Sequence, residues 1–189
     1  MLTFGQLGRI IDMIHMDFTL QQAICGRNRK NIKLIESATG TAIYFPPPYS
    51  RYFRFCPKNA SPRDPNEIII TGDKPRQIEL AKLKLGDLLN RCRLYVKDVP
   101  MPPEKVDTIL LTRLDKVRKI VEANGSYIQF PPLGSRSTPV RIQATENLHI
   151  ERTVRELMSL VSLAGRSCLN HTDAISGWSI LQRILGSSA

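Results

Sequence analysis

Cysteine and histidine are scarce in this chain, and those present stand apart. Its 189 residues hold 4 cysteines, 3 histidines and 1 tryptophan. The cysteines form no Cys-x-x-Cys pair, and the histidines are not spaced to complete a zinc ligand set. The sequence also has no P-loop, no Ser-His-Asp or Cys-His arrangement and no paired carboxylates at a recognisable site. We therefore expect no metal, no cofactor and no enzymatic activity.

Long apolar runs are missing as well. No stretch approaches the length of a membrane span, and no apolar segment with a small-residue cleavage signal follows the N-terminus. Isolated cysteines suit a reducing compartment. These observations predict a cytoplasmic or nuclear protein that is neither secreted nor held in a membrane.

Acidic residues are few relative to basic ones. The chain has 27 Lys and Arg against 17 Asp and Glu, which gives a net charge of +10. An excess of this size favours an anionic partner, most often nucleic acid and less often an acidic membrane surface. The alternative is a charge scattered over the surface that serves only solubility.

The first half of the chain alternates between strand and helix patterns. Short runs rich in branched apolar residues predict strands at 9–17, 41–45 and 67–71, and a proline-rich stretch at 49–65 predicts a long loop. Helices are expected at 18–25, at about 30–39 and at 74–91. The buried stripe of the second helix is expected to contain Ile32, Leu34 and Ile35, and Gly40 suits the left-handed position that ends it.

The last helix of this half, residues 74–91, is amphipathic. Its apolar positions follow the helical period, and we expect them on its inner side: Ile78, Leu80, Ala81, Leu85, Leu88 and Leu89.

The second half repeats this order. Ile-x-Phe-Pro-Pro occurs at 43–47 and again at 128–132, each time after a helix that ends in glycine. Strands are predicted at 93–99, 126–130 and 140–144, and helices at 102–111, 116–124 and 147–164. An internal repeat of this kind predicts two similar structural units.

The residues around the first turn resemble those of a KH domain, the RNA-binding module with a Gly-x-x-Gly loop between two helices. The matching positions are Ile24, Gly26, Ile32, Ile35, Thr39 and Gly40. Arg29 stands in place of the second loop glycine. In the second copy, residues 112–115 (Thr-Arg-Leu-Asp) contain neither glycine.

The resemblance implies an α+β fold made of two KH-like βααββα domains. Each would have a three-stranded antiparallel sheet covered by three helices, as in type I, or eukaryotic-type, KH domains. We expect the first domain at 1–91 and the second at 92–165. Residues 166–189 would be a linker and a short amphipathic C-terminal helix, and the chain would be a fragment of a longer protein. Because only residues 90–93 join the domains, we expect one unit with a shared interface.

A KH domain clamps about four nucleotides of a single strand at its loop. The resemblance and the basic residues near the loop give a set of RNA-binding candidates in which Arg27, Arg29, Lys30 and Lys33 form a cluster without an acid. The full set is Gly26, Arg27, Asn28, Arg29, Lys30, Lys33, Ile24, Ile43, Phe45, Arg51 and Arg54. For Ile43, as for Ile32, a place in the core is the better interpretation.

Other residues are candidates for protein contacts. Aromatic side chains between arginines in the long loop suit either base stacking or a protein interface, or they are buried against the sheet edge. The protein-contact candidates are Tyr52, Phe53 and Phe55, with Trp178 and Leu181 of the C-terminal segment. That segment is also interpreted as a helix packed onto a domain.

The leading hypothesis is a non-catalytic RNA-associated protein that binds single-stranded RNA mainly through its first domain. Its other partners would be proteins of an RNA-processing or messenger-ribonucleoprotein complex, with a role in post-transcriptional regulation. The alternative is a protein-interaction scaffold whose KH folds have lost direct RNA binding. Thr112, Leu114 and Asp115 obstruct a phosphate at the second loop, so we expect this domain to be structural or protein-binding.

Overall fold

The computed structural model describes residues 8–49, 64–135 and 139–167, with side chains up to residue 162. The predicted RNA contacts Arg51 and Arg54 lie outside these residues. So do the predicted protein contacts Tyr52, Phe53, Phe55, Trp178 and Leu181.

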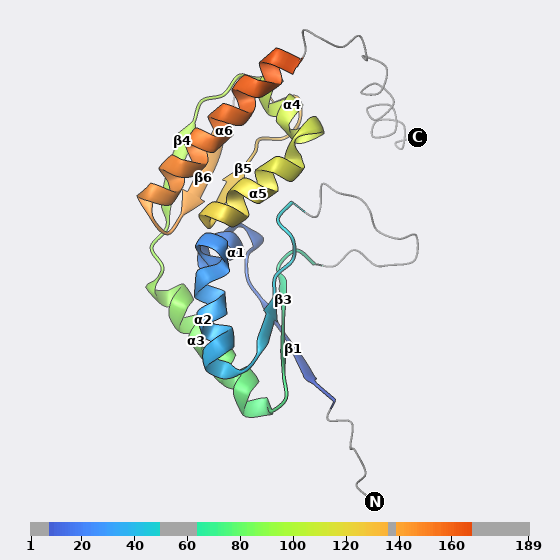
Figure 1. Cartoon of the computed structure of the whole chain (residues 1–189), viewed down its shortest axis with the longest axis vertical. Helices are drawn as coiled ribbons and strands as arrows, with labels where there is room; N and C mark the ends of the chain where they lie inside the picture. Colours follow the sequence, from blue (N-terminus) through green and yellow to red (C-terminus); the bar gives the residue numbers. More distant parts are fainter. Residues whose placement is uncertain (1–7, 50–63, 136–138, 168–189) are drawn as a thin grey trace, which may run out of the picture.

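The described residues form two units with the predicted βααββα order (Figure 1). The first contains β1 (Ile10–His15), α1 (Phe18–Cys25), the short 3-10 helix η1 (Arg27–Arg29), α2 (Lys30–Thr39), β2 (Ala42–Tyr44), β3 (Glu67–Gly72) and α3 (Pro75–Arg91). The second contains β4 (Tyr95–Val99), α4 (Pro103–Thr112), α5 (Leu114–Asn124), β5 (Ser126–Gln129), β6 (Val140–Ala144) and α6 (Asn147–Ser167).

Each unit has one antiparallel sheet of 3 strands, in the order β1-β3-β2 and β4-β6-β5. The predicted fold class is confirmed. The closing helix α6 is longer than expected, since it reaches Ser167 rather than residue 164.

Helices cover one face of each sheet, and the core of each unit lies between. In the first unit Ile68 and Ile70 of β3 face Ile32 and Ile78, all at most 2% exposed. The predicted stripe of α2 is wrong at Leu34, which is 60% exposed. This residue lies about 200° around the helix from Ile32, so one narrow face cannot bury both.

Helix α3 also buries fewer residues than predicted. Ile78, Ala81 and Leu85 are buried, but Leu80 and Leu89 are exposed. The reason is that a two-layer unit covers only one side of the helix, and that side follows a spacing of three to four residues.

The two units share an interface, as the short linker predicts. Helix α1 of the first unit lies against β5 of the second (Figure 1). The Phe18 ring meets the Tyr127 ring edge-on at 5.7 Å between centroids, and the Gln143 side-chain amide donates to the Thr19 carbonyl at 2.7 Å.

Tyr49 connects the first unit to the core of the second. Its side chain is 5% exposed, and its ring stacks on Tyr127 at 5.5 Å. Its hydroxyl donates to the Ile128 carbonyl at 2.9 Å and accepts from the Ile128 amide at 3.3 Å. No local signal distinguishes Tyr49 from the rest of the long loop predicted at 49–65.

Tyr49→Phe is expected to lower the free energy of unfolding by about 1–3 kcal/mol, because a buried N–H and C=O would lose their partner. Chemical denaturation measures this change. Tyr44→Phe is the matched control, since Tyr44 is 49% exposed and should change stability little. Equal losses in both variants would contradict the role assigned to the Tyr49 hydroxyl.

Candidate nucleic-acid interface

Residues 26–29 form the turn between α1 and α2. Gly26 has φ 69° and ψ 175°, a conformation that is essentially restricted to glycine. A Cβ atom at this position would lie 2.7 Å from the Asn31 side-chain nitrogen, which itself donates to the Ile24 carbonyl at 3.1 Å. The backbone conformation therefore requires glycine here, and a Cβ atom would also displace the Asn31 side chain from its hydrogen bond.

Arg29 adopts a left-handed backbone, which glycine favours. Its φ and ψ are 61° and 28°, and Asn28 before it has a φ of 50°. Left-handed backbone costs a residue other than glycine about 1–2 kcal/mol. The side chain of Arg29 forms contacts that can offset this cost.

The Arg29 side chain crosses from the loop to strand β2. Its Nη2 donates to the Ile43 carbonyl at 2.8 Å and lies 3.6 Å from Oε1 of Glu36. The same Glu36 oxygen accepts from the Ile43 amide at 2.8 Å. The guanidinium carbon lies 6.0 Å from the centre of the Phe45 ring, at the outer limit of a cation–π contact.

The expectation of a basic cluster without an acid is therefore wrong. Glu36 follows Arg29 by seven residues, about two helical turns, so both side chains lie on the same side of α2. That spacing in the sequence could have suggested the ion pair. The contact of both side chains with Ile43 could not have been found without the fold.

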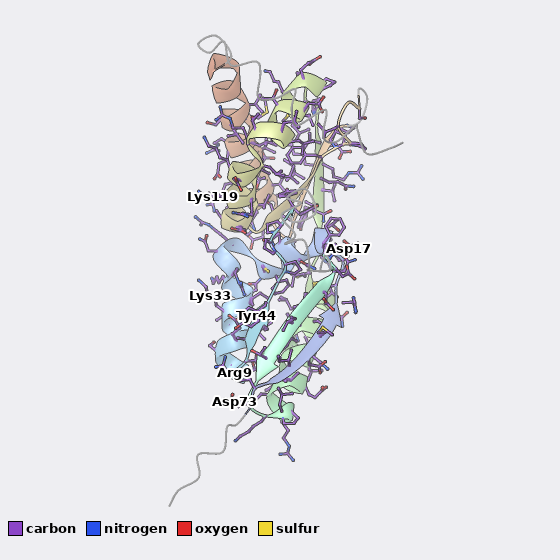
Figure 2. All side chains as sticks on the ribbon, turned by 90° about the vertical axis from the view of Figure 1, so that its right-hand side faces the viewer. Arg9, Asp17, Lys33, Tyr44, Asp73 and Lys119 are labelled. Carbon is purple, nitrogen blue, oxygen red and sulfur yellow. The ribbon has the colours of Figure 1, made fainter. Side chains whose placement is uncertain are left out.

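A groove of about 630 Å³ opens between the loop, β2 and the second unit. Three cationic side chains line it: Arg29, Lys33 and Lys119. Lys119 comes from α5 of the second unit and was not among the predicted site residues. Figure 2 shows Lys33 and Lys119 on the same side of the molecule, one in each unit. The remaining lining residues are Gln22, Cys25, Asn28, Phe45, Pro46, Pro47, Pro48, Glu122 and Ala123.

A second hollow, of about 1020 Å³, lies on the other side of the loop. Arg27, Lys30 and Lys33 line it from the first unit, and Glu146 and His149 from the second. Asn28 and Lys33 border both hollows. In the described part of the chain, no ion pair is formed by Arg27, Lys30 or Lys33, and all three are exposed.

The predicted RNA-binding residues that the structure describes fall into three groups. Those of the turn and of the start of α2 line the two hollows, with Gly26 buried and the others at least partly exposed: Gly26, Arg27, Asn28, Arg29, Lys30 and Lys33. Ile24 and Ile43 are each 1% exposed, so their side chains belong to the core, as does that of Ile32. Phe45 is half-buried in the groove wall.

Cys25 is one of the residues that line the groove. Burial raises its pKa to about 12, with Arg29 opposing and Glu36 adding to the shift. The thiol is therefore protonated at neutral pH and is a poor nucleophile. Within the described ranges, no three His, Cys, Asp or Glu side chains come together as metal ligands. No helix in that part combines the length and apolar character that a membrane span needs.

The second unit has no comparable loop. A single residue, Arg113, separates α4 from α5, and Leu114 is 6% exposed in the core. Asp115 is exposed and lies 3.7 Å from Arg118. The amide of Gly134 donates to Asp107 of α4 at 3.1 Å, which ties the β5–β6 connection to that helix.

Comparison with known families gives the same two units. Residues 8–92 match the family described as "KHD4 second KH domain", and residues 96–164 match "Mug60/KHD4 KH type I domain". The chain carries two KH domains in tandem. KH domains bind single-stranded nucleic acid and are generally non-catalytic. The first unit is hereafter the first KH domain, and the second unit the second KH domain.

The chain is also similar to a fungal protein and to archaeal structures. It is 30% identical over 157 residues to "K homology domain-containing protein 4" of Mycosarcoma maydis, covering 77% of this chain but only 11% of that protein. The structure of Dim2p from Pyrococcus horikoshii is 17% identical and covers 80% of this chain and 90% of its own, with a TM-score of 0.29. A P. horikoshii a/eIF2alpha-aDim2p-rRNA complex is 15% identical and covers 95% and 96%, with a TM-score of 0.30.

Proposed function

We propose that this chain binds single-stranded RNA in the groove of its first KH domain, without catalysing a reaction. The observation that carries this proposal is the meeting of Arg29, Lys33 and Lys119 along one groove at the turn between α1 and α2. Cationic side chains spaced along a groove bind the phosphates of a single strand. Exposed Arg27 and Lys30 extend the same basic surface past the loop.

In this proposal the second KH domain forms one side of the groove and is not a separate binding site. Its α5 supplies Lys119 to the groove, and its Gly125 supports the loop from behind. Its own turn, residues 112–115, holds no glycine and carries Asp115, which would repel a phosphate. Such a protein would act in the cytoplasm or nucleus with other proteins that bind RNA.

The affinity for a short labelled single-stranded RNA, measured by fluorescence anisotropy at low and physiological salt, tests the proposal. Lys119→Glu should weaken binding by on the order of tenfold at low salt, because a phosphate contact is replaced by repulsion. The slope of log K against log salt should also fall by about 0.7 for the lost contact.

Lys105→Glu is the matched control. Lys105 is exposed on α4 and borders neither hollow. Its replacement by glutamate therefore changes the net charge as much as Lys119→Glu does and leaves the groove unaltered. Equal weakening by both substitutions, or no binding by the native chain, would contradict the proposal.

A second candidate function is a protein-interaction scaffold. Leu34 and Leu83, on α2 and α3 of the first domain, are 60% and 63% exposed, and such side chains suit a protein partner. The same titration distinguishes the two functions, since a scaffold needs no affinity for RNA.

A further inference from the structure

Ile43 and Ile128 hold corresponding positions in the two domains. Both begin an Ile-x-Phe-Pro-Pro run, and both lie on one of the two outer strands of their sheet, β2 in one domain and β5 in the other. Ile43 pairs with Ile70 of β3, and Ile128 pairs with Ile142 of β6. An outer strand has backbone donors and acceptors that its sheet does not use, and these are free to bind a ligand.

In the first domain, side chains of the same chain already occupy these groups. The Ile43 amide donates to Glu36 at 2.8 Å, and the Ile43 carbonyl accepts from Arg29 at 2.8 Å. Arg29 and Glu36 therefore act together, as a bridge between α2 and β2. We call this pair the Arg29–Glu36 cap. The guanidinium also lies near the Phe45 ring, on which a base could otherwise stack.

In the second domain a different residue does the same. The Tyr49 hydroxyl bonds both the amide and the carbonyl of Ile128. The two caps share no residue type, yet both occupy the outward donor and acceptor of the same repeat position. This coincidence is the observation that carries the inference.

We propose that the chain binds single strands through their phosphates without discriminating among bases, because the outward backbone groups of Ile43 and Ile128 are already occupied from within. This inference rests on the proposed function. Discrimination among bases requires donors and acceptors aimed at base edges, whereas phosphate contacts are the same for every sequence. The Arg29 side chain is 43% exposed, so its remaining N–H donors can bind a phosphate while Nη2 stays on Ile43.

The two caps differ in how readily they can be removed. Tyr49 is buried between the domains, and its loss would disturb their interface. Arg29 and Glu36 are 43% and 25% exposed, and an exposed ion pair contributes little to folding. Arg29→Gly also restores the residue that the left-handed backbone favours. The Arg29–Glu36 cap is therefore the one to test.

The experiment compares native chain with the double variant Arg29→Gly, Glu36→Ala. Affinities for short homopolymers of U, A and C are measured by anisotropy at low salt. Native affinities should agree within about threefold across bases, since phosphates dominate binding. The double variant should bind at least one base about tenfold better than another, the scale of a base-edge contact. Faster hydrogen exchange of the Ile43 amide, followed by NMR, would show that the cap has opened in a folded protein.

The matched control is Arg27→Ala, Glu122→Ala. It removes one cation and one anion beside the hollows without touching Ile43, so affinity can change but bases should stay equivalent. A tenfold base preference in the native chain would overturn the inference. So would a double variant that keeps equal affinities although its Ile43 amide is uncovered.

The two proposals fail differently. If the native chain binds RNA but prefers one base tenfold, the inference is wrong and the proposed function stands. If neither protein binds any homopolymer, both proposals are wrong.

Discussion

Gly125→Ala is expected to lower the free energy of unfolding by on the order of 2–5 kcal/mol, the sum of a backbone cost and a steric cost. Gly125 ends α5 with φ 63°, where alanine is disfavoured by about 1–2 kcal/mol. A Cβ atom there would lie 2.5 Å from both the Arg27 nitrogen and the Gly26 carbonyl carbon. Both atoms are backbone, so no rotamer change can relieve the contact.

The clash acts at the contact between the two domains. Gly125 belongs to the second domain, and the backbone that it touches is the turn of the first. To make room, α5 and the turn must separate. We therefore expect lower stability in urea, together with weaker RNA binding, because the turn and Lys119 would no longer border one groove.

Gly134→Ala separates the two costs. Gly134 also has a positive φ, 77°, but no atom lies within 4 Å of a Cβ built there. The Gly134→Ala variant should lose only about 1–2 kcal/mol of unfolding free energy, the cost of the left-handed backbone, and its RNA affinity should not change. If the two alanine variants lose equal stability, the contact between Gly125 and the turn does not hold the domains together.

The local features of this fold could be predicted from the sequence because local physics decides them. Gly40 and Gly125 both adopt the left-handed conformation expected at the end of a helix. The repeated run after each of them gives the edge strands β2 and β5. Between the glycines and prolines that end each element, the spacing of the apolar residues indicates whether a segment is a helix or a strand.

Features that depend on distant residues could not be predicted in this way. Leu34 has the apolar character of a core residue, but which face of α2 is covered depends on α3 and β2. Lys119 lines the groove and Tyr49 is buried only because one domain packs on the other. The pattern of apolar residues along the sequence does not predict that packing. The sequence therefore predicted the part of the candidate site at residues 26–29, but not the part that Lys119 of the second domain contributes.

Arg29 shows where the family resemblance was informative and where it was not. The resemblance identified this position as the one that departs from the usual glycine, and the structure shows a left-handed backbone there, which glycine favours. The consequence of the departure depends on Glu36 and on the Ile43 backbone. A changed motif residue thus acts as a new contact rather than as a simple obstruction.

The triple variant Arg27→Glu, Lys30→Glu, Lys33→Glu is expected to lose RNA affinity by about 100-fold or more at low salt. All three side chains are exposed, and they line the two hollows on either side of the turn. Each contact with a single-strand phosphate contributes about 0.7 to the salt slope, so the slope should fall by about 2. Anisotropy across a salt series measures both quantities.

This variant should keep its fold. Lys30 begins α2 and Lys33 lies in its first turn, where a carboxylate interacts favourably with the helix dipole. Thermal denaturation should therefore show a melting temperature close to that of the native chain. A loss of binding without a loss of stability would assign the effect to the surface itself.

The control with the same change in net charge is Arg76→Glu, Lys105→Glu, Arg155→Glu. These residues are exposed on α3, α4 and α6, and none borders either hollow. If the basic excess acts only as a general field, both triple variants should weaken binding alike. If RNA lies along the turn, the control should keep most of its affinity and salt slope. The comparison therefore decides whether the charge of +10 is a property of the whole surface or of one site on it.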